Sequence, residues 1–285
     1  MNGRIIDGEM MSGFSSYLHA EEKSAATWEK YLRDVRMFLR YMGERAVTKE
    51  EVLQWRDHLI RQQYAVRSVN SMLASVNSFL SFMGWQECRV KSLRLQRQTY
   101  CAEERELTKE EYFRLLDAAE GDEQLRLVLQ TICSTGIRVS ELQYFTVEAV
   151  RRGSVRIRCK GKNREILLPR KLRVLLLNYI HAKALRSGPV FLGKSGKPLD
   201  RSSIWRRMKA LCRAAGVEAS KVFPHNLRKL FARIFYGLEK DIAKLADLLG
   251  HSNLNTTRIY LVSTGREHLR QLEQMGLVAW RSCVT

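Results

Sequence analysis

The sequence predicts a mainly helical protein with one small antiparallel β-sheet, in which an N-terminal helical bundle precedes a C-terminal mixed α/β domain. Apolar residues recur at helical spacing along most of the chain. One short stretch near the middle instead alternates apolar and basic residues, with the period of a β-strand. The length of 285 residues suits about two ordinary domains. We expect these domains to span residues 1–100 and 101–285.

The N-terminal domain is predicted to consist of helices between residue 9 and about residue 92. Ser24 is a suitable N-cap for a helix with a clear apolar face. Thr48 and Glu51 have the spacing of a capping box, in which the hydroxyl and the carboxylate each satisfy a free N–H group. A further helix is expected over residues 66–83. Its outer face is rich in Ser and Asn, which suit either contact with a DNA backbone or an ordinary solvated surface.

The C-terminal domain begins after residues 93–106, a segment that loses helical periodicity and gathers charge. Thr108 and Glu111 form a second predicted capping box. Alternation over residues 155–160 predicts a strand, the sequence Gly-Lys-Asn at 161–163 predicts a turn, and a second strand follows at 166. Further helices are expected at about 170–186, 200–215, 225–237, 239–249 and 256–274.

The charge of the chain points to a polyanionic partner. Lys and Arg total 49 against 30 Asp and Glu, and the formal net charge of +19 is spread along the whole chain. Nucleic acid is the commonest partner for such a protein, with an anionic membrane surface or simple solubility as alternatives. No stretch has the roughly 18 uninterrupted apolar residues of a membrane span, and the N-terminus lacks a signal peptide. We expect a cytoplasmic, nucleoid-associated protein that binds DNA and no membrane.

Two stretches of the C-terminal domain carry cations suited to phosphate. Arg138 lies in Thr-Gly-Ile-Arg-Val-Ser-Glu-Leu, in the predicted first turn of a helix, with Glu141 three residues later. Lys160 precedes the turn of the predicted β-hairpin. Taken alone, the first is an Arg beside a Glu and the second is a Lys that projects into solvent.

Two further stretches add histidines, an arginine and a tyrosine. His225 and Arg228 are three residues apart, so they share one face near a helix N-terminus, which attracts anions. His251 follows Gly250, and Tyr260 lies nine residues further on, one turn inside the predicted last helix. A tyrosine in such a helix is more often packed in a core than used in catalysis.

In their order and spacing, these stretches resemble the tyrosine recombinases, also called the phage-integrase family. That family combines an Arg in a T-G-x-R-x-S-E-L box, a Lys in a β-hairpin, an H-x-x-R box and a G-H-S…T-T-x-x-Y box. The resemblance covers the N-terminal helical domain more loosely, as a SAM-like core-binding domain, and it implies a C-shaped clamp on DNA. The catalytic residues that it implies are Arg138, Lys160, His225, Arg228, His251 and Tyr260.

The chemistry of these residue types agrees with the resemblance. Attack on a DNA phosphate builds negative charge on the non-bridging oxygens, which arginines can bind and histidines can support. Lys160 fits the general acid that protonates the leaving oxygen. Tyr260 would attack phosphorus and form a 3′-phosphotyrosyl intermediate, provided that neighbouring cations help it to lose its proton. The sequence contains no Walker phosphate-binding loop and no carboxylate cluster, so we expect no cofactor and no metal.

Several alternatives stay open at this point. The family commonly has His-x-x-Arg-His, whereas Lys229 occupies the last position here, which suggests a divergent branch. Lys162 competes with Lys160 as the hairpin lysine. A type IB topoisomerase or a non-catalytic DNA-binding regulator on the same fold would share much of this pattern. A relaxation assay without a paired site would distinguish the topoisomerase.

The short N-terminal region suggests a simple, two-domain Xer-like recombinase, since the first helix begins by about Met11. The resemblance then implies double-stranded DNA with short inverted-repeat core sites as substrate, and a homo-tetramer on two sites, with a second related recombinase as a possible partner. Integration, excision or inversion of a mobile element is the expected outcome. Apolar residues in the C-terminal segment 276–285 are expected to dock either on a neighbouring subunit or on their own domain.

Overall fold

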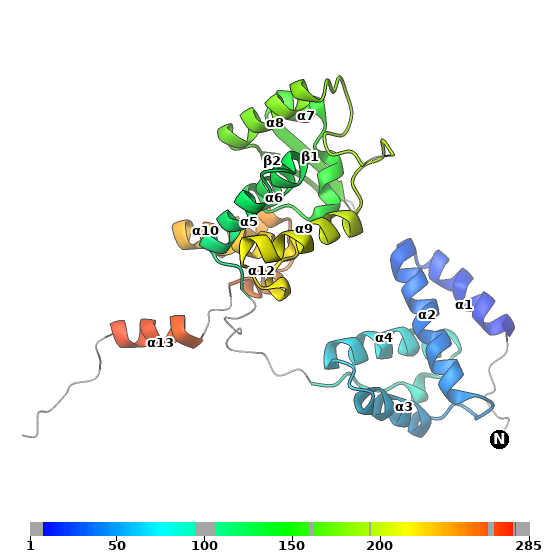
Figure 1. Ribbon diagram of the computed structural model, residues 1–285. Helices are drawn as coiled ribbons and strands as arrows, with labels where there is room; N and C mark the ends of the chain where they lie inside the picture. Colours follow the sequence, from blue (N-terminus) through cyan, green and yellow to red (C-terminus); the bar gives the residue numbers. More distant parts are fainter. Residues whose placement is uncertain are drawn as a thin grey trace, which may run out of the picture. The chain divides into compact units, whose positions relative to one another are not determined.

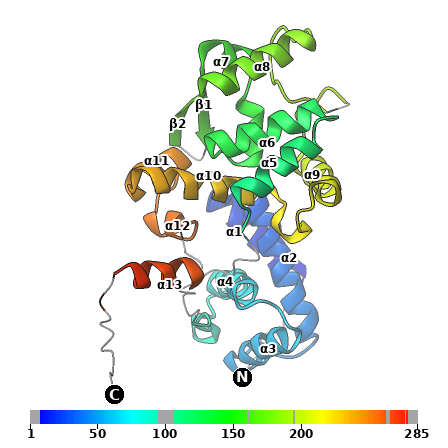
Figure 2. The ribbon, with the colours of Figure 1, turned by 60° about the vertical axis from the view of Figure 1, so that its left-hand side comes forward.

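A computed structural model shows the chain as two compact units, Met1–Arg97 and Gln98–Thr285 (Figures 1 and 2). It describes residues 8–94, 106–159, 162–193, 195–261, 265–275 and 277. Within these residues most of the chain is helical, and the one sheet has two antiparallel strands. The prediction of a mainly helical fold with a small antiparallel sheet is therefore confirmed. No helix of the described part is long and apolar enough to cross a membrane.

In its described residues, the N-terminal unit is a small bundle of four α-helices. They are α1 (Gly8–Ala20), α2 (Ala25–Met42), α3 (Lys49–Arg61) and α4 (Val66–Phe82), followed by a short 3-10 turn, η1 (Gln86–Cys88). Aromatic side chains fill its core: Phe14 meets Phe79 edge-on at 5.2 Å between ring centroids, and Phe38 meets Trp55 at 5.1 Å. The helix predicted over 66–83 is confirmed as α4.

Two helix starts of this unit differ from a full capping arrangement. Ser24 is the N-cap of α2, but its hydroxyl contacts the Thr27 hydroxyl at 2.9 Å and no backbone N–H of the helix. Thr48 accepts a hydrogen bond from the backbone of Glu51 at 3.2 Å. The Glu51 carboxylate turns to Arg45 instead, at 2.7 Å. In the C-terminal unit, the second predicted capping box, between Thr108 and Glu111, is present with both of its hydrogen bonds.

The polar face of α4 serves the unit itself. Asn70 exchanges two hydrogen bonds with the backbone of Leu93, at 2.9 and 2.7 Å. Asn77 does the same with Val90, at 2.8 and 3.1 Å. These side chains fasten the segment after η1 to the helix, and Ser75 is buried. The sequence suggested DNA contact or a solvated surface for this face. Asn70, Asn77 and Ser75 instead form contacts within the unit.

The C-terminal unit is built around α6, which packs against α5, α8, α9 and α10. Its helices are α5 (Lys109–Ala118), α6 (Glu123–Thr135), η3 (Val139–Tyr144), α7 (Val147–Arg152), α8 (Arg170–Ala182), α9 (Arg201–Ala215), η4 (Ala219–Lys221), α10 (Pro224–Glu239), α11 (Ile242–Leu249), α12 (Leu254–Arg258) and α13 (Gly265–Gln274). The hairpin of β1 (Ser154–Cys159) and β2 (Lys162–Leu167) lies beside α7 and η3.

The hairpin begins its second strand earlier than the sequence predicts. Cys159 pairs with Lys162 and Ser154 with Leu167, so positions 162 and 163 belong to β2 and not to the turn. The alternation itself is confirmed, since Val155 and Ile157 are buried.

The prediction of one helix over 256–274 is wrong. Asn253 accepts a hydrogen bond from the N–H of Asn255 and starts α12 early, and α12 ends at Arg258. Tyr260 therefore lies in the turn after a helix, not inside one. Its N–H bonds the carbonyl of Thr257, three residues back, in the tightened pattern that closes a helix.

A buried carboxylate ties α2 to α4. Asp34 is almost fully buried; Lys30 contacts its Oδ2 atom at 2.6 Å and the Ser75 hydroxyl donates to the same atom at 2.9 Å. Arg33 contacts the other oxygen at 3.3 Å from the surface, with a mostly exposed side chain.

Replacing Asp34 tests this tie. Asp34→Ala should lower the free energy of unfolding by about 2 kcal/mol, because Lys30 and Ser75 lose their shared acceptor. Arg33→Ala is the matched control, since an exposed ion pair contributes about 0–1 kcal/mol. Urea unfolding followed by circular dichroism measures both, and equal effects of the two variants would contradict a structural role for the buried carboxylate.

Candidate active site

Arg138 is positioned by the tight turn that ends α6. Gly136 has a φ of +64°, and a side chain there would meet the ring of Phe231 at 2.3 Å, so the turn requires glycine. Arg138 is the residue before η3, one position earlier than predicted. Glu141 accepts from the Arg138 N–H at 2.7 Å and from its guanidinium at 3.1 Å. The Arg138 side chain is 45% exposed, so its guanidinium is held and still accessible.

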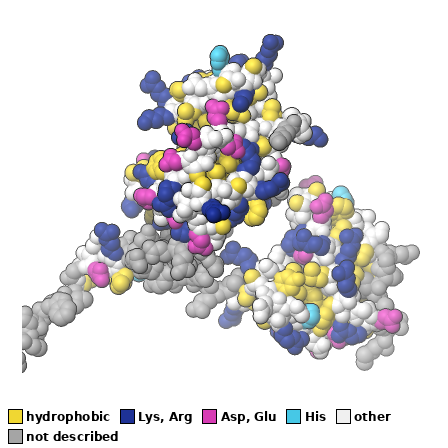
Figure 3. Space-filling view, viewed as in Figure 1, with side chains coloured by type: hydrophobic (Ala, Val, Ile, Leu, Met, Phe, Trp, Pro, Cys, Tyr) yellow, Lys and Arg dark blue, Asp and Glu magenta, His cyan; other side chains and the backbone are white. Residues whose placement is uncertain are grey.

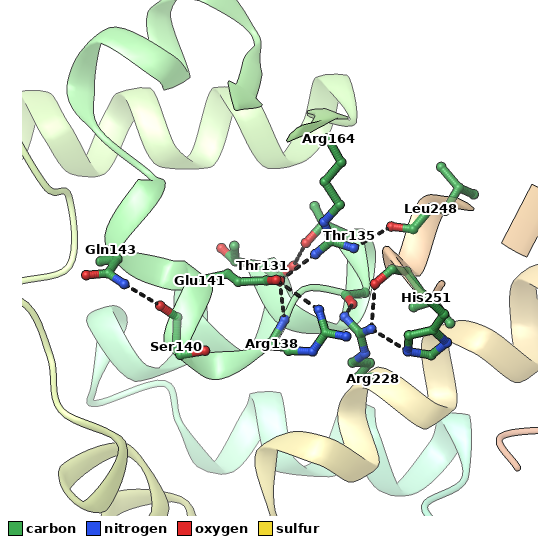
Figure 4. Close-up of polar contacts among 12 residues, drawn as sticks. Thr131, Thr135, Arg138, Ser140, Glu141, Gln143, Arg164, Arg228, Leu248 and His251 are labelled. Carbon is green, nitrogen blue, oxygen red and sulfur yellow. Dashed lines mark hydrogen bonds and ion pairs between the residues drawn. The ribbon is translucent and has the colours of Figure 1, made fainter. Parts of the chain in front are cut away.

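Arg228 is buried in the middle of the site, with an exposed fraction of 1% (Figure 4). Its guanidinium donates to the carbonyl of Gly136 at 2.5 Å and to that of Leu249 at 2.7 Å. Its Nε atom has no hydrogen-bond partner among the described residues. Burial, and then the charge of Arg138, lower the pKa of Arg228 to about 10, while the electrostatic interaction with Tyr260 opposes that shift. The group stays charged at neutral pH.

His251 is locked as a neutral imidazole. Its Nε2 atom lies 2.9 Å from a nitrogen of Arg228, and its Nδ1 atom lies 2.9 Å from the hydroxyl of buried Thr257. An arginine can only donate, so Nε2 must accept and Nδ1 must carry the proton. Partial burial, and then Arg228 and Arg138, lower the pKa of His251 to about 4, in agreement with this tautomer.

His225 lies at the N-terminal end of α10, directly after Pro224. The missing N–H of proline costs nothing in the first turn, and the free N–H groups there favour an anion. Burial, and then Arg228 and other nearby cations, lower the pKa of His225. An anion bound among these cations would reverse part of that shift.

Tyr260 packs against the two histidines of the site. Its ring packs between the rings of His225 and His251, with centroids at 5.1 and 5.3 Å, and only 7% of the residue is exposed. The side chain also interacts electrostatically with Arg228. The ring also contacts a small apolar cluster that includes Leu245. Tyr260 is therefore both packed in a core and close to the arginines and histidines of the site.

A pocket of about 340 Å³ opens beside these groups. Its lining consists of Ile137, Arg138, Val139, Ser140, Arg201, Trp205, Phe223, Pro224, His225 and Arg228. Three arginines and a histidine line it, and none of the described residues in its wall is acidic. A pocket of this composition favours an anion. Lys and Arg side chains also spread over the visible faces of both units, as expected from the net charge (Figure 3).

Comparison with known families agrees with this geometry. The profile of the phage integrase family matches residues 105–266, and that of the phage integrase N-terminal SAM-like domain matches residues 11–87. The chain belongs to the phage integrase family. The predicted identity as a tyrosine-type, site-specific recombinase enzyme is thereby confirmed.

Relatives of this recombinase share its full length. The tyrosine recombinase XerA of Pyrococcus furiosus is 28% identical, with 98% of each chain covered. XerA of Thermococcus kodakarensis is 31% identical, over 93% of this chain and 94% of the relative.

Solved structures share the fold of the recombinase. The XerH recombinase bound to its difH substrate, in a pre-cleavage complex, has a TM-score of 0.68 at 19% identity and covers 95% of this chain and 90% of its own. A lambda integrase dimer bound to a COC′ core site has a TM-score of 0.73 at 16% identity and covers 90% and 96%.

The structure brings five of the six predicted site residues of the recombinase together. Arg138, His225, Arg228, His251 and Tyr260 meet in the contacts above. Lys160 lies outside the described residues. Lys162 begins β2, but its side chain also lies outside the described part, so the choice between the two lysines stays a prediction.

Lys229, which departs from the family pattern, has a structural partner. It pairs at 3.3 Å with Glu106, a nearly buried carboxylate that Arg233 also contacts at 3.1 Å. Its side chain thus joins α10 to the segment that enters α5.

Sequence reasoning missed several residues around the site. Glu141 was noted only as a neighbour of Arg138, although their i, i+3 spacing already allowed the contact. Thr257 was noted only as part of the T-T-x-x-Y box. Arg164, Arg201 and Trp205 gave no local signal, because their relation to the site arises from packing between distant elements. Trp205, nearly half exposed on α9, lines the pocket wall.

The lowered pKa of His251 predicts a pH effect on stability. The unfolded ring takes up a proton near pH 6.5 and the folded ring near pH 4, so the folded state loses stability as pH falls through this window. After allowance for solvent screening, wild type should lose about 1 kcal/mol more than His251→Asn between about pH 6.5 and about pH 4. Urea unfolding across this pH range measures the difference. Parallel pH profiles for the two proteins would contradict the locked neutral imidazole.

Proposed function

We propose that this recombinase breaks and rejoins DNA through a covalent bond between Tyr260 and the 3′ phosphate of the cut strand. The observation that carries the proposal is the position of Tyr260, whose ring packs between His225 and His251 and whose side chain interacts with Arg228, beside a pocket whose charged groups are all cationic. A nucleophile and an anion-binding pocket therefore lie within one chain.

The scissile phosphate is proposed to bind between Arg138 and Arg228. The exposed guanidinium of Arg138 can offer two donors to the non-bridging oxygens. The unpartnered Nε of buried Arg228 supports this placement, because an orphan buried donor is costly until an acceptor arrives. The N-terminus of α10 and His225 add further donors. Such positioned donors are typically worth about 3–4 kcal/mol of transition-state stabilisation each.

In the proposed reaction the Tyr260 oxygen attacks phosphorus and the bond to the 5′ oxygen breaks. The phenolic proton leaves toward solvent, and the departing 5′ oxygen takes a proton from the hairpin lysine, Lys160, with Lys162 as the alternative. The phosphotyrosyl ester keeps the energy of the broken bond. A 5′ hydroxyl from another strand can then attack it, restore a phosphodiester and release the tyrosine.

Replacing Tyr260 tests the nucleophile. Duplexes are first selected from a random-sequence pool by covalent capture on the wild-type protein. Tyr260→Phe should bind a selected duplex as wild type does and should form no adduct on a denaturing gel. Tyr236→Phe is the matched control, because Tyr236 packs in the same apolar cluster. It should form the adduct at the wild-type rate.

Each other result has a distinct meaning. An adduct on Tyr260→Phe would show that another residue attacks. A wild-type protein that binds duplexes and captures none would instead be a DNA-binding regulator. Relaxation of a plasmid that lacks the selected site would indicate a topoisomerase.

We further propose the substrate and the assembly. Both units would bind double-stranded core sites with short inverted repeats, and the N-terminal unit would act as a core-binding domain. Four copies would act together on two such sites in the nucleoid, either alone or with a second related recombinase. Support comes from solved relatives, such as a lambda integrase tetramer bound to a Holliday junction. Movement of a mobile element by integration, excision or inversion is the proposed outcome.

The C-terminal segment is proposed to join neighbouring copies. On α13 and just after it, Leu269, Leu272, Met275 and Leu277 are all more than half exposed, as suits a surface that another subunit covers. The rest of the predicted segment, including Trp280, lies outside the described residues.

Deleting residues 276–285 tests this role. The shortened protein should bind one selected duplex normally and fail to pair two, because binding needs only one chain while pairing needs contacts between chains. Electrophoretic mobility measures both states. Undiminished pairing of duplexes would rule out exchange of this segment.

A further inference from the structure

Arg164 on β2 links three segments that meet at the site (Figure 4). One guanidinium nitrogen lies 2.5 Å from Oε2 of Glu141, and another donates to the carbonyl of Leu248 at 2.8 Å. Its side chain is 14% exposed; the contact to Glu141 is partly buried, whereas the contact to Leu248 lies at the surface. The β-hairpin is thereby fastened to the turn that carries Arg138 and to the end of α11, just before His251.

Glu141 divides its oxygens between two arginines. Oε2 accepts from Arg164 and from the backbone N–H of Arg138, while Oε1 contacts the Arg138 guanidinium at 3.1 Å. The carboxylate is nearly buried, with 6% of the side chain exposed. Removing either guanidinium would leave a buried charge with two of its three contacts.

Gly250 provides the room that Arg164 needs. A side chain at position 250 would lie 2.9 Å from the Cδ and Nη1 atoms of Arg164, and the φ of +64° also favours glycine. The guanidinium therefore lies directly over the turn that leads to His251. Its charge contributes to the lowered pKa of His251, after the effects of burial, Arg228 and Arg138.

We propose that Arg164 is a positioning residue that holds the β1–β2 hairpin, and with it the lysine that protonates the leaving oxygen, against the phosphate pocket. Arg164 is four residues from Lys160 and two from Lys162 in the same hairpin. An anchor this close to the turn limits how far either lysine can move from a phosphate bound at Arg138. The proposal rests on the proposed function, because it assigns a role within the same reaction.

The test compares two duplexes that differ at one atom. Both carry the sequence selected by wild-type capture, but in one the 5′ bridging oxygen of the scissile phosphate is sulfur. A thiolate leaves without protonation, since a thiol is a far stronger acid than an alcohol. A defect in placing the general acid is therefore repaired by the sulfur duplex, and a defect in phosphate binding is not.

Arg164→Gln should form the covalent adduct about 100-fold more slowly than wild type on the normal duplex. On the sulfur duplex the deficit should shrink to about tenfold or less. Arg164→Lys, which can keep one of the two contacts, should be intermediate on the normal duplex and rescued in the same way. If Arg164→Gln does not fold, the comparison of the two duplexes is made with Arg164→Lys alone.

Two control variants show what no defect and a defect in phosphate binding look like on the two duplexes. Arg156→Gln removes an exposed arginine of β1 whose contact to Glu165 is long, at 3.7 Å, and it should match wild type on both duplexes. Arg138→Ala should be slow on both, because its proposed role is at the non-bridging oxygens.

Three outcomes decide the matter. Selective rescue of the Arg164 variants supports the proposal. Equal deficits on the two duplexes, or full activity of a folded Arg164 variant on the normal duplex, would overturn it. Absence of any adduct with the wild-type protein would instead count against the proposed function itself.

Discussion

The guanidinium of Arg228 is buried, and it spans the carbonyl oxygens of Gly136 and Leu249 at 2.5 and 2.7 Å. Taking a charge out of water is costly, and such a group persists only where acceptors surround it. Here the acceptors are backbone atoms at the ends of α6 and α11, so the cost is met only when both helix ends are in place. The turn that carries Arg138 and the turn that carries His251 are therefore fixed by one side chain. Tyr260 interacts with the same guanidinium and packs against His251, which that guanidinium also contacts.

The charge balance of the site explains why it suits a phosphate. Arg138, Arg164 and Arg228 converge on one buried carboxylate, Glu141, and on backbone carbonyls. Carbonyl oxygens carry only partial charge, so an excess of positive charge remains beside the pocket. Burial and neighbouring cations also lower the pKa values of both site histidines, which are consequently neutral at neutral pH. A phosphate in the pocket would relieve this imbalance and turn the same groups into donors for its oxygens.

Sequence reasoning found the groups whose spacing is local. The Thr108 capping box, the alternation of Val155 and Ile157, and the Arg138, His225 and Arg228 boxes all follow from residues within a few positions of one another. It failed where distant elements decide the outcome. The last predicted helix is interrupted near Tyr260, where the tyrosine ring packs between two histidines from other parts of the unit. Asn70 and Asn77 bind backbone beyond η1 rather than solvent or DNA. Arg164 and Trp205 had no local pattern that marked them.

The central claim is that the tyrosine held at Arg228 becomes bonded to DNA, and peptide mapping of the covalent adduct tests it most directly. Wild-type adduct on a selected duplex is digested with nuclease and trypsin, and the peptides are sequenced by mass spectrometry. Cleavage after Arg258 and Arg266 yields a peptide of residues 259–266, in which Tyr260 is the one tyrosine. We predict that the residual nucleotide is attached to this peptide at Tyr260. A nucleotide on any other residue would contradict the claim.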